Sequence, residues 1–416
     1  MRNTGNWAGN IDFGTAPTAR PGSVDELRRI VASSERVRAL GAGHSFSGIL
    51  ATAGGFVRLD GLPPAVDIDA EAGTATVTAG MRYTDVAAAL HRAGYALANL
   101  ASLPDLSVAG ATATGTHGSG DSQQSLSAAV AGLELVGPEG DLVELRRDVD
   151  RDTFAGAVVS LGALGVATRV TLEIEPAFDV AQSVREAVPL DAVRDRFDEV
   201  FAAAYSVSAF TTWGDDASVW LKRRIDRPVT GLDLGTPARG PLHPVPGADP
   251  APCTAQLGAP GPWHLRLPHF RPGATPDTGD ELQSEYFLPR AAAPAAFDAL
   301  RGIGGLLGPA LHVAEVRTVR GDDLWLSPAY ERDSVAFHFT WVKDAARVLP
   351  VIGAVEELLA PLGARPHWAK LTAMTGDAIR SCYRRASDFA DLLAKSDPDG
   401  KFANEFVDGL FPREAR

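Results

Sequence analysis

A strand-like segment that runs into a glycine loop is the feature that most constrains the fold of this chain. The loop, from Leu40 to Gly48, has the sequence LGAGHSFSG. Because glycine has no Cβ, a strand followed by Gly-x-Gly can bring backbone N–H groups close to a pyrophosphate. A Rossmann site also requires a third glycine that opens a helix and an acidic residue about 20 positions later. Here the segment that follows, residues 54–62, is strand-like, which disfavours a Rossmann crevice and leaves both a nucleotide loop and a plain turn open.

A second glycine-rich passage, residues 107–120, favours the nucleotide loop. Its sequence is SVAGATATGTHGSG, with four glycines and five hydroxyl side chains. An unpaired loop of this kind costs conformational entropy unless a ligand or a neighbouring segment orders it. A solvated surface loop is the alternative for either passage alone. Two such passages in one unit favour a cradle for an extended dinucleotide.

Hydrophobic periodicity predicts a first unit of mixed helices and strands over residues 1–177. Its first helix begins with a capping box, in which Ser23 precedes Glu26 by three positions. A second helix is predicted to be capped by Thr84 and closed by Gly94.

Residues 178–375 form a second unit in which strands and helices alternate. Residues 225–280 are rich in proline and glycine, and we interpret them as long surface loops because periodic patterns resume after them. The alternation predicts an antiparallel α+β sheet. The predicted strands are 282–290, 311–319 and 334–342, and the predicted helices are 292–307 and 345–362.

The acidic composition disfavours two classes of partner. The net charge is −13 and the isoelectric point is about 5.2, whereas binding to nucleic acid or anionic lipid uses a clustered basic surface. No apolar run approaches the roughly 20 residues that cross a bilayer, and the N-terminal residues lack the apolar core of a secretory signal. Cys253 and Cys382 permit one disulfide but no disulfide framework. We expect a cytoplasmic monomer that binds neither nucleic acid nor membranes.

Three polar groups in the second unit are candidates for acid–base chemistry. Alternate residues of a strand share a face, so the side chains of Glu315 and Arg317 lie together, and those of His338 and Thr340 do too. Such groups are also common as salt bridges worth about 0–1 kcal/mol or as structural histidines. The third group, a short segment around Trp368, contains Arg365, His367 and Lys370.

Metal and serine-nucleophile chemistry are disfavoured. His264 and His269 lack the helical i, i+4 spacing of zinc enzymes, and Pro268 between them argues against a helix. The chain also contains no G-x-S-x-G elbow. We therefore expect no bound metal.

Seven passages occur in an order that resembles a known family. They are NWAGN, GAGHSFSG, NLASLPDLSVAGATATGTHGSG, EVRTV, HFTW, RPHWAK and DPDGKFANEF. Together they are similar to the bacterial alditol oxidases, the xylitol and sorbitol oxidases of the vanillyl-alcohol oxidase superfamily of flavoproteins. The resemblance covers essentially the whole chain, and the sugar-lactone oxidases share the HWAK segment and the histidine loop.

The resemblance implies an α+β, two-domain protein with a PCMH-like FAD-binding domain. Residues 1–177 and the returning segment 376–416 would form that domain, and residues 178–375 would form a substrate domain that caps the flavin. His44 corresponds to the histidine that carries FAD covalently, through a ring nitrogen bonded to the flavin 8α carbon. The other cofactor-binding residues implied are Gly41, Ala42, Gly43, Ser45, Phe46, Ser102, Ser107, Gly110, Thr114, Gly115, His117, Val166, His367 and Lys370.

The resemblance also implies a polyol site. Ser102, Glu315, Arg317 and Thr340 would bind the substrate, and Arg317, Lys370 and His338 would be catalytic. The reaction implied is oxidation of the terminal C1 hydroxyl of xylitol or sorbitol to an aldose, with hydride transfer to flavin N5 and reduction of O2 to H2O2. Either His338 or a bound water would take the hydroxyl proton.

Two other functions remain open from the sequence. A sugar-1,4-lactone oxidase or dehydrogenase, of the gulonolactone or arabinonolactone type, is the nearest alternative, although NWAGN and EVRTV favour the polyol. A non-catalytic flavin-binding protein is disfavoured because every polar residue expected at the site is present. The departures are Ser47 and Gly48, where relatives often have larger polar residues, and Ala369 in place of a glycine; they leave the preferred chain length of the substrate open.

Overall fold

The N-terminal residues form a small parallel sheet with one capped helix beside it. The structure is a computed structural model that describes residues 5–228, 231–274 and 279–413. Strands β1 (Thr18–Ala19) and β2 (Val37–Ala39) both pair in parallel with β3 (Gly55–Val57). Helix α1 (Val24–Ser33) begins as predicted, because the side chain of Ser23 accepts the Glu26 N–H at 3.2 Å.

A five-stranded antiparallel sheet forms the centre of the first body. Its order is β4–β5–β9–β7–β8. The strands are β4 (Val66–Asp69), β5 (Thr74–Thr78), β7 (Val130–Val136), β8 (Leu142–Arg146) and β9 (Val166–Glu173), and a separate pair joins β6 (Tyr95–Ala96) to β10 (Glu175–Pro176). The accompanying helices are α2 (Tyr83–Arg92), α3 (Val108–Ala113) and α4 (Arg147–Ala157), with 3-10 turns η1 (Gly48–Leu50), η2 (Leu59–Gly61) and η3 (Leu126–Ala129).

The predicted start of α2 is wrong by two residues and in its capping group. The N-cap position is Arg82 and makes no side-chain cap hydrogen bond. The Thr84 hydroxyl instead donates to the Asp105 carboxylate at 2.7 Å. This tertiary hydrogen bond uses the side chain that the local pattern predicted as the N-terminal cap of the helix. Gly94 follows the helix with a φ of +86°, in line with the predicted stop.

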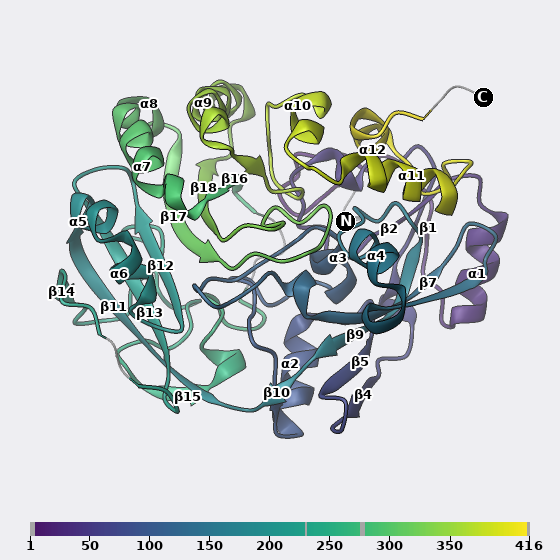
Figure 1. Cartoon of the computed structure of the whole chain (residues 1–416), viewed down its shortest axis with the longest axis horizontal. Helices are drawn as coiled ribbons and strands as arrows, with labels where there is room; N and C mark the ends of the chain where they lie inside the picture. Colours follow the sequence, from purple (N-terminus) through teal and green to yellow (C-terminus); the bar gives the residue numbers. More distant parts are fainter. Residues whose placement is uncertain (1–4, 229–230, 275–278, 414–416) are drawn as a thin grey trace.

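The second body is built on a nine-stranded antiparallel sheet, as the strand and helix alternation predicted (Figure 1). Its order is β14–β11–β13–β12–β17–β18–β16–β19, with β15 paired to β11. The strands are β11 (Asp179–Pro189), β12 (Ser206–Thr211), β13 (Asp216–Arg224), β14 (Thr236–Pro237), β15 (Pro260–Pro262), β16 (Glu281–Pro289), β17 (Leu311–Val319), β18 (Ser334–Val342) and β19 (Arg365–Pro366). The helices are α5 (Leu190–Asp195), α6 (Phe197–Ala202), α7 (Ala293–Gly302), α8 (Gly304–Leu307) and α9 (Ala345–Leu359), with η4 (Trp263–Leu265), η5 (Arg290–Ala292) and η6 (Ala360–Leu362).

One face of this sheet is apolar and covered by helices, and the other is polar. The core on the helix side combines Phe337, Phe339 and Trp341 of β18 with Phe297 of α7 and Ile352 of α9. Because side chains alternate along a strand, the residues between these core positions face the opposite side. That opposite face turns toward the first body.

The proline-rich segment 225–280 is only partly the surface loop that we predicted. Within its described residues, 225–228, 231–274 and 279–280, regular structure is limited to β14, β15 and η4. However, the side chain of Trp263 is fully buried in the first core and that of His269 is 5% exposed. The lack of periodicity correctly predicted that this segment contains little regular secondary structure. It did not predict burial, which here depends on tertiary contacts.

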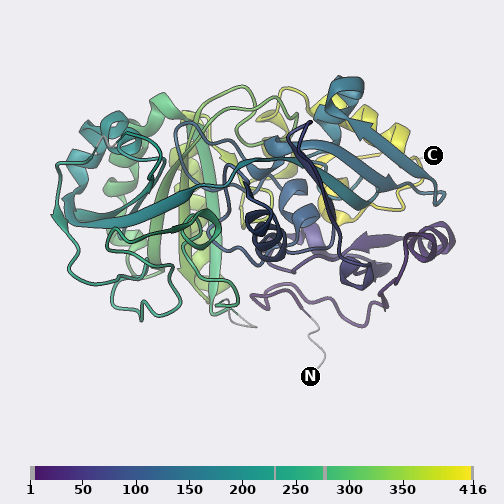
Figure 2. The same ribbon diagram turned by 90° about the horizontal axis from the view of Figure 1, so that it is seen from below.

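The chain ends on the first body. Helices α10 (Gly376–Ser381), α11 (Ala386–Ser396) and α12 (Glu405–Leu410) follow the last strand, and Phe389 and Leu410 belong to the same core as Leu27 and Val77. In two perpendicular views the yellow helices α11 and α12 lie on the side of the purple N-terminal segments, and Figure 1 shows α10 between α12 and α9 of the second body (Figures 1 and 2). Cys253 and Cys382 are free thiols. In the described part of the chain, every helix is too short or too polar to cross a membrane.

Candidate active site

A cavity of about 650 Å³ lies between the two bodies. It is enclosed by the glycine loop after β2, the second glycine-rich passage around α3, and the polar face of β16, β17 and β18. The predicted site residues found in its lining are Gly41, Ala42, Gly43, His44, Ser45, Phe46, Ser102, Ser107, Gly110, Thr114, His117, Glu315, Arg317, His338, Thr340, His367 and Lys370. The fold thus gathers residues that are more than 300 positions apart in the sequence.

Two predicted cofactor residues lie outside this lining. Val166, at the start of β9, is buried in the first core, and its neighbours Gly165 and Ala167 line the cavity. Gly115 has a φ of +68°, and a Cβ there would lie 3.0 Å from Pro328 Cδ. Strand alternation turns the Val166 side chain into the core, and the positive φ of Gly115 places it in a turn. A contact of either residue with the cofactor would therefore be made by its backbone, and both stay predictions.

The two glycine-rich passages approach each other closely. A Cβ on Gly41 would overlap the hydroxyl of Ser107, so the approach depends on glycine at this position. Gly43 has a φ of +73°, and the space where its Cβ would lie is open for 4 Å. The N–H of Trp7, from the NWAGN segment, donates to the Gly43 carbonyl at 2.8 Å and fixes the far end of the loop.

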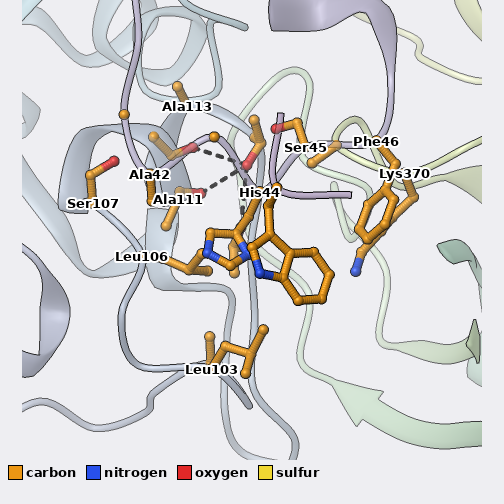
Figure 3. A pocket seen from close by; sticks show the side chains of 18 of the residues that line it. Ala42, His44, Ser45, Phe46, Leu103, Leu106, Ser107, Ala111, Ala113 and Lys370 are labelled. Carbon is orange, nitrogen blue, oxygen red and sulfur yellow. Dashed lines mark hydrogen bonds between the residues drawn. The ribbon is translucent and has the colours of Figure 1, made fainter. Parts of the chain in front are cut away.

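The imidazole of His44 lies in the cavity in its neutral form. Burial, reinforced by the positive charges of Lys370 and Arg82, lowers the pKa of His44 to about 4. The ring stacks on the indole of Trp7 with centroids 5.0 Å apart. Figure 3 shows His44 at the centre of the lining, between the loop of Ala42 and Ser45 and the side chain of Leu103. A neutral imidazole has a nitrogen lone pair that is available for bonding to an electrophilic carbon.

The polar face of the sheet arranges its side chains in rows across three strands. Glu315 of β17 pairs with His338 of β18, and His338 pairs with Glu285 of β16. In the adjoining row, Thr340 pairs with Gln283. Directly paired residues point to the same side of a sheet, so the register alone brings these five groups to the cavity.

Arg317 is held between two carboxylates. One of its terminal nitrogens donates to Glu285, the other donates to Ser102 Oγ at 3.3 Å, and its Nε lies 3.6 Å from Glu315 Oε2. Burial opposes ionisation of Glu285, but the charges of Arg317 and His117 outweigh it and hold the pKa of Glu285 well below its usual value. The pKa of Glu315 is likewise low, because Arg317 and then His269 outweigh the burial that would raise it. Both carboxylates are therefore ionised.

Lys370 brings a second cation to the cavity. Its Nζ donates to Gln283 Oε1 and lies 3.5 Å from His338 Nε2. Burial lowers the pKa of Lys370 to about 8, an effect that the charge of Glu285 partly opposes. Burial, and then the charge of Lys370, lowers the pKa of His338 to about 3. The pair is therefore a lysine ammonium beside a neutral imidazole below about pH 8.

The HWAK segment that carries Lys370 is bonded directly to the glycine loop. The Phe46 N–H donates to the Ala369 carbonyl at 2.7 Å, and Ser47 Oγ donates to the Trp368 carbonyl at 2.7 Å. Figure 3 shows Phe46 and Lys370 close together, and the ammonium lies 5.4 Å from the centre of the phenyl ring. Arg365, which the sequence grouped with Lys370, lies outside the cavity lining and donates to backbone carbonyls instead.

The sequence reasoning did not assign three polar residues of the cavity lining to the site: His269, Gln283 and Glu285. It also missed Lys222, which lies behind His269 outside the lining. Glu285 and Lys222 are each 1% exposed, but other polar residues accompany them in their strands, so the sequence alone does not mark them as buried. Their roles could be interpreted only once the order of the strands in the sheet was known.

One cluster of metal-ligating residue types occurs among the residues that the structure describes. It consists of His117, Glu285 and His367, whose ligand atoms lie within 4.8 Å of one another. The Arg317 guanidinium already donates to Glu285, and a fixed cation at this distance disfavours a second one. The absence of a metal remains a prediction.

The cavity fits an extended dinucleotide with a ring system at the Lys370 end. Its volume of about 650 Å³ falls in the range of about 300–1,000 Å³ typical of ligand sites. Small residues line the part between the two glycine-rich passages, where a backbone can approach a pyrophosphate closely. The His44 ring and the ammonium of Lys370 line the same cavity. These donors and this shape suit FAD, which would lie between His44 and the polar sheet face.

Comparison with known sequences and structures agrees with this fit. The family described as "FAD binding domain" matches residues 16–146, and the family described as "D-arabinono-1,4-lactone oxidase" matches residues 280–410. The solved structure of cholesterol oxidase from B. sterolicum superposes with a TM-score of 0.79 at 15% identity, covering 98% of this chain and 96% of that one. A solvent-stable cholesterol oxidase gives a TM-score of 0.79 at 17% identity with the same coverage. The fold is the vanillyl-alcohol-oxidase-type, PCMH-like fold, and the protein is an FAD-dependent oxidoreductase.

Relatives that match over nearly their full length indicate a more specific family within these oxidoreductases. An alditol oxidase of Streptomyces sp. is 48% identical over 97% of this chain and 98% of its own length. An L-gulono-1,4-lactone dehydrogenase of Mycobacterium tuberculosis is 29% identical, with 97% of each chain covered, and the L-gulonolactone oxidase of Mus musculus is 26% identical, with 98% and 97% covered. The chain belongs to the alditol oxidase family of these flavoproteins.

Proposed function

We propose that this enzyme oxidises the terminal C1 hydroxyl of an open-chain alditol, such as xylitol or sorbitol, to the aldose and passes the electrons to O2, which forms H2O2. The single observation that carries the proposal is the arrangement of Arg317 between two ionised carboxylates, with Ser102 and Thr340 in the same cavity. This set alternates fixed donors and acceptors, as a chain of adjacent hydroxyls requires. The 48% identity to an alditol oxidase supports the substrate class.

The protein side of the reaction follows from charge and geometry. When bound, FAD supplies the acceptor for the hydride that leaves C1. Arg317, whose own charge is fixed, can donate to the reacting hydroxyl and favour its alkoxide character. Lys370 places a positive charge in a buried site, where it stabilises negative charge that develops during the reaction without reorganisation.

The acceptor for the hydroxyl proton is better assigned to water than to His338. The burial that lowers the pKa of His338 to about 3, together with the nearby charge of Lys370, makes its imidazolium unfavourable. The neutral ring can still accept a hydrogen bond at Nε2, 3.5 Å from the Lys370 ammonium. We assign His338 to orienting the hydroxyl and a bound water to carrying the proton away.

We further propose that FAD is attached covalently through His44. Three observations support this assignment: the ring lines the cavity, burial keeps it neutral, and the Trp7 indole stacked at 5.0 Å limits its rotation. Attachment at this loop would hold the flavin near Lys370 without relying on binding equilibrium.

The competing function is a lactone oxidase or dehydrogenase, which the family match over residues 280–410 and the 29% identical dehydrogenase favour. The test is to add xylitol, sorbitol or L-gulono-1,4-lactone anaerobically to the purified yellow protein and to follow the visible flavin absorbance. Rapid bleaching by the polyols and slow bleaching by the lactone is the expected result. The reverse order would overturn the substrate assignment.

Readmitting air then tests the electron acceptor. The flavin colour should return with formation of H2O2, since the small side chain of Ala101 in the cavity lining leaves room for oxygen. A colour that returns only with an added dye would identify a dehydrogenase instead.

A further inference from the structure

A buried line of polar side chains extends from the cavity into the second body. It runs from Lys222 of β13 through His269 to Glu315 of β17, and these side chains are between 1% and 5% exposed. Lys222 Nζ lies 3.0 Å from His269 Nδ1, and His269 Nε2 lies 2.7 Å from Glu315 Oε1. His269 therefore bridges two strands that are separated in the sheet by β12.

The ring of His269 is held by two aromatic contacts, and its backbone is hydrogen-bonded. Phe210 and Trp220 contact it edge-on, with centroids 5.3 and 5.5 Å away. Its own N–H donates to the carbonyl of Ser102 at 3.0 Å, and its carbonyl accepts the N–H of Thr254 at 2.9 Å. His269 thus contacts Glu315 through its side chain and also anchors the backbone of Ser102 through its own backbone.

The protonation states of Lys222, His269 and Glu315 determine the direction of the hydrogen bonds between them. Burial lowers the pKa of Lys222 to about 7, but its amine and its ammonium both carry N–H donors. The ionised carboxylate of Glu315 can only accept, so Nε2 of His269 is the donor to it and Nδ1 accepts from Lys222 Nζ. The neutral ring then carries its single proton on Nε2 and donates it to Glu315 Oε1. Burial, and then the charge of Lys222, lowers the pKa of His269 to about 4, so the ring is neutral near pH 7. Lys222 also donates to the Leu267 carbonyl, which fixes the amino group from the other side.

This arrangement defines what Glu315 offers to a substrate. One carboxylate oxygen is occupied by His269, and the other lies 3.6 Å from Arg317 Nε. The carboxylate is ionised and can only accept hydrogen bonds. Its partner in the cavity must therefore be an O–H or N–H donor. An open-chain alditol has a hydroxyl on every carbon, whereas a 1,4-lactone replaces two of these donors by a carbonyl and a ring oxygen.

We propose that Lys222 and His269 are positioning residues that present Glu315 as an acceptor for a substrate hydroxyl and so give the site its preference for open-chain polyols over sugar lactones. The inference rests on the proposed polyol oxidation and deepens it. Losing the partner of a fixed hydrogen-bonding group is expected to discriminate strongly, because the site's polar groups are then left unpaired.

The experiment compares the holoenzyme with three variants at these positions. His269→Phe keeps a ring between Phe210 and Trp220 but cannot donate to Glu315. His269→Gln restores a side-chain N–H donor. Lys222→Met keeps the buried stem and removes the amino group. For each we would measure covalently bound FAD, thermal stability, and kcat and KM for xylitol and L-gulono-1,4-lactone from steady-state turnover with O2 or an added dye as the electron acceptor.

In His269→Phe we expect the KM for xylitol to rise about 10- to 100-fold, while kcat changes less than about 3-fold and flavin content is unchanged. The KM for the lactone should change much less, so that the preference for xylitol falls. His269→Gln should recover most of the KM, and Lys222→Met should raise it by roughly 3- to 10-fold, because His269 then loses the bond that fixes its tautomer. His264→Phe is the control: this partly buried histidine contacts His91 at a tilt of 45° and lies outside the cavity lining, so the KM of the variant should match the wild type.

An unchanged KM in a folded His269→Phe protein would overturn the proposal. Equal losses of kcat and stability in the Phe and Gln variants would do so too, since they would indicate a purely structural role. If His269→Phe does not fold, the KM of Lys222→Met decides in the same way. Failure of the wild-type protein to oxidise any polyol would instead refute the proposed function, and the two failures are thereby distinguished.

Discussion

Glu285→Gln is a substitution that tests how the site is held together. Glu285 lies on β16 with its side chain 1% exposed, accepts from Arg317, and lies 3.0 Å from His117 Nε2. Gln has nearly the same volume, so the change removes charge and leaves packing almost unaltered. It separates the electrostatic contribution of this carboxylate from its shape.

The magnitude follows from what remains around Arg317. Removing one partner of a buried ion pair costs about 3–5 kcal/mol. Glu315 still lies 3.6 Å from Arg317 Nε, and His117 keeps its contact with the Gly118 carbonyl at 2.8 Å, so we expect about 3 kcal/mol, the lower end of that range. With an unfolding entropy of roughly 2.1 cal/mol/K per residue, a chain of 416 residues would lose about 3–4 °C in Tm.

The difference should depend on pH in a defined direction. The folded-state pKa of Glu285 lies well below its usual value, because Arg317 and His117 outweigh burial. A carboxyl of this kind contributes stability that is fully present above its unfolded pKa of about 4.3 and is lost as pH falls toward the folded pKa. The gap in Tm between wild type and Glu285→Gln should therefore be widest near neutral pH and shrink below about pH 4.

Thermal unfolding followed by circular dichroism at two pH values is the assay. The matched control is Glu199→Gln, which breaks an exposed pair with Arg196 and should lower Tm by less than about 1 °C. A Glu285→Gln protein with wild-type Tm at pH 7 would refute the reasoning, as would a gap that grows on acidification.

Three further predictions concern the cofactor and the reaction. His44→Ala should leave FAD that is released by acid precipitation, and colour retained in the precipitate would exclude covalent attachment at this histidine. Because burial lowers the pKa of Lys370 to about 8, kcat/KM for xylitol should fall as pH rises through about 8 and the ammonium is lost; a flat profile across that range would contradict the assigned role. Gly41→Ala should lower the FAD content of the purified protein, since its Cβ would overlap the Ser107 hydroxyl. Ser107→Ala in the same chain should restore part of that content, and the exposed change Gly305→Ala, with open space around its Cβ, should have no effect.

Local patterns were sufficient where neighbours in sequence are also neighbours in space. The alternation of EVRTV and HFTW predicted that Glu315 shares a face with Arg317, and that His338 shares one with Thr340, and the structure places all four in the cavity lining. The N-terminal cap at Ser23 followed from the same kind of reasoning. In both cases one short segment determines the geometry, so periodicity alone is adequate.

Local patterns failed where a distant residue competes for the same group. Threonine is a residue type that often caps helices, but the hydroxyl of Thr84 donates to Asp105 and the helix begins without a side-chain cap. Val166 was expected at the cofactor from the family resemblance, and its pairing with Val136 of β7 turns its side chain into the core, which leaves only its backbone for such a contact. Neither outcome can be obtained from a window of ten residues.

The remaining site residues could not be predicted from the sequence, because the order of the strands in the sheet determines which side chains they contact. Glu285 lies in the strand ELQSEYFLP and Lys222 in the strand DASVWLKRR, and neither charge can be interpreted until its partner is known. The order β13–β12–β17–β18–β16 identifies both partners: it places His338 between two carboxylates, and it separates Lys222 from Glu315 by one strand, a distance that His269 bridges. The sequence does not single out Lys222, because Arg223 and Arg224 follow it directly, and only the sheet order shows that Lys222 and Glu285 serve the same arginine–carboxylate centre.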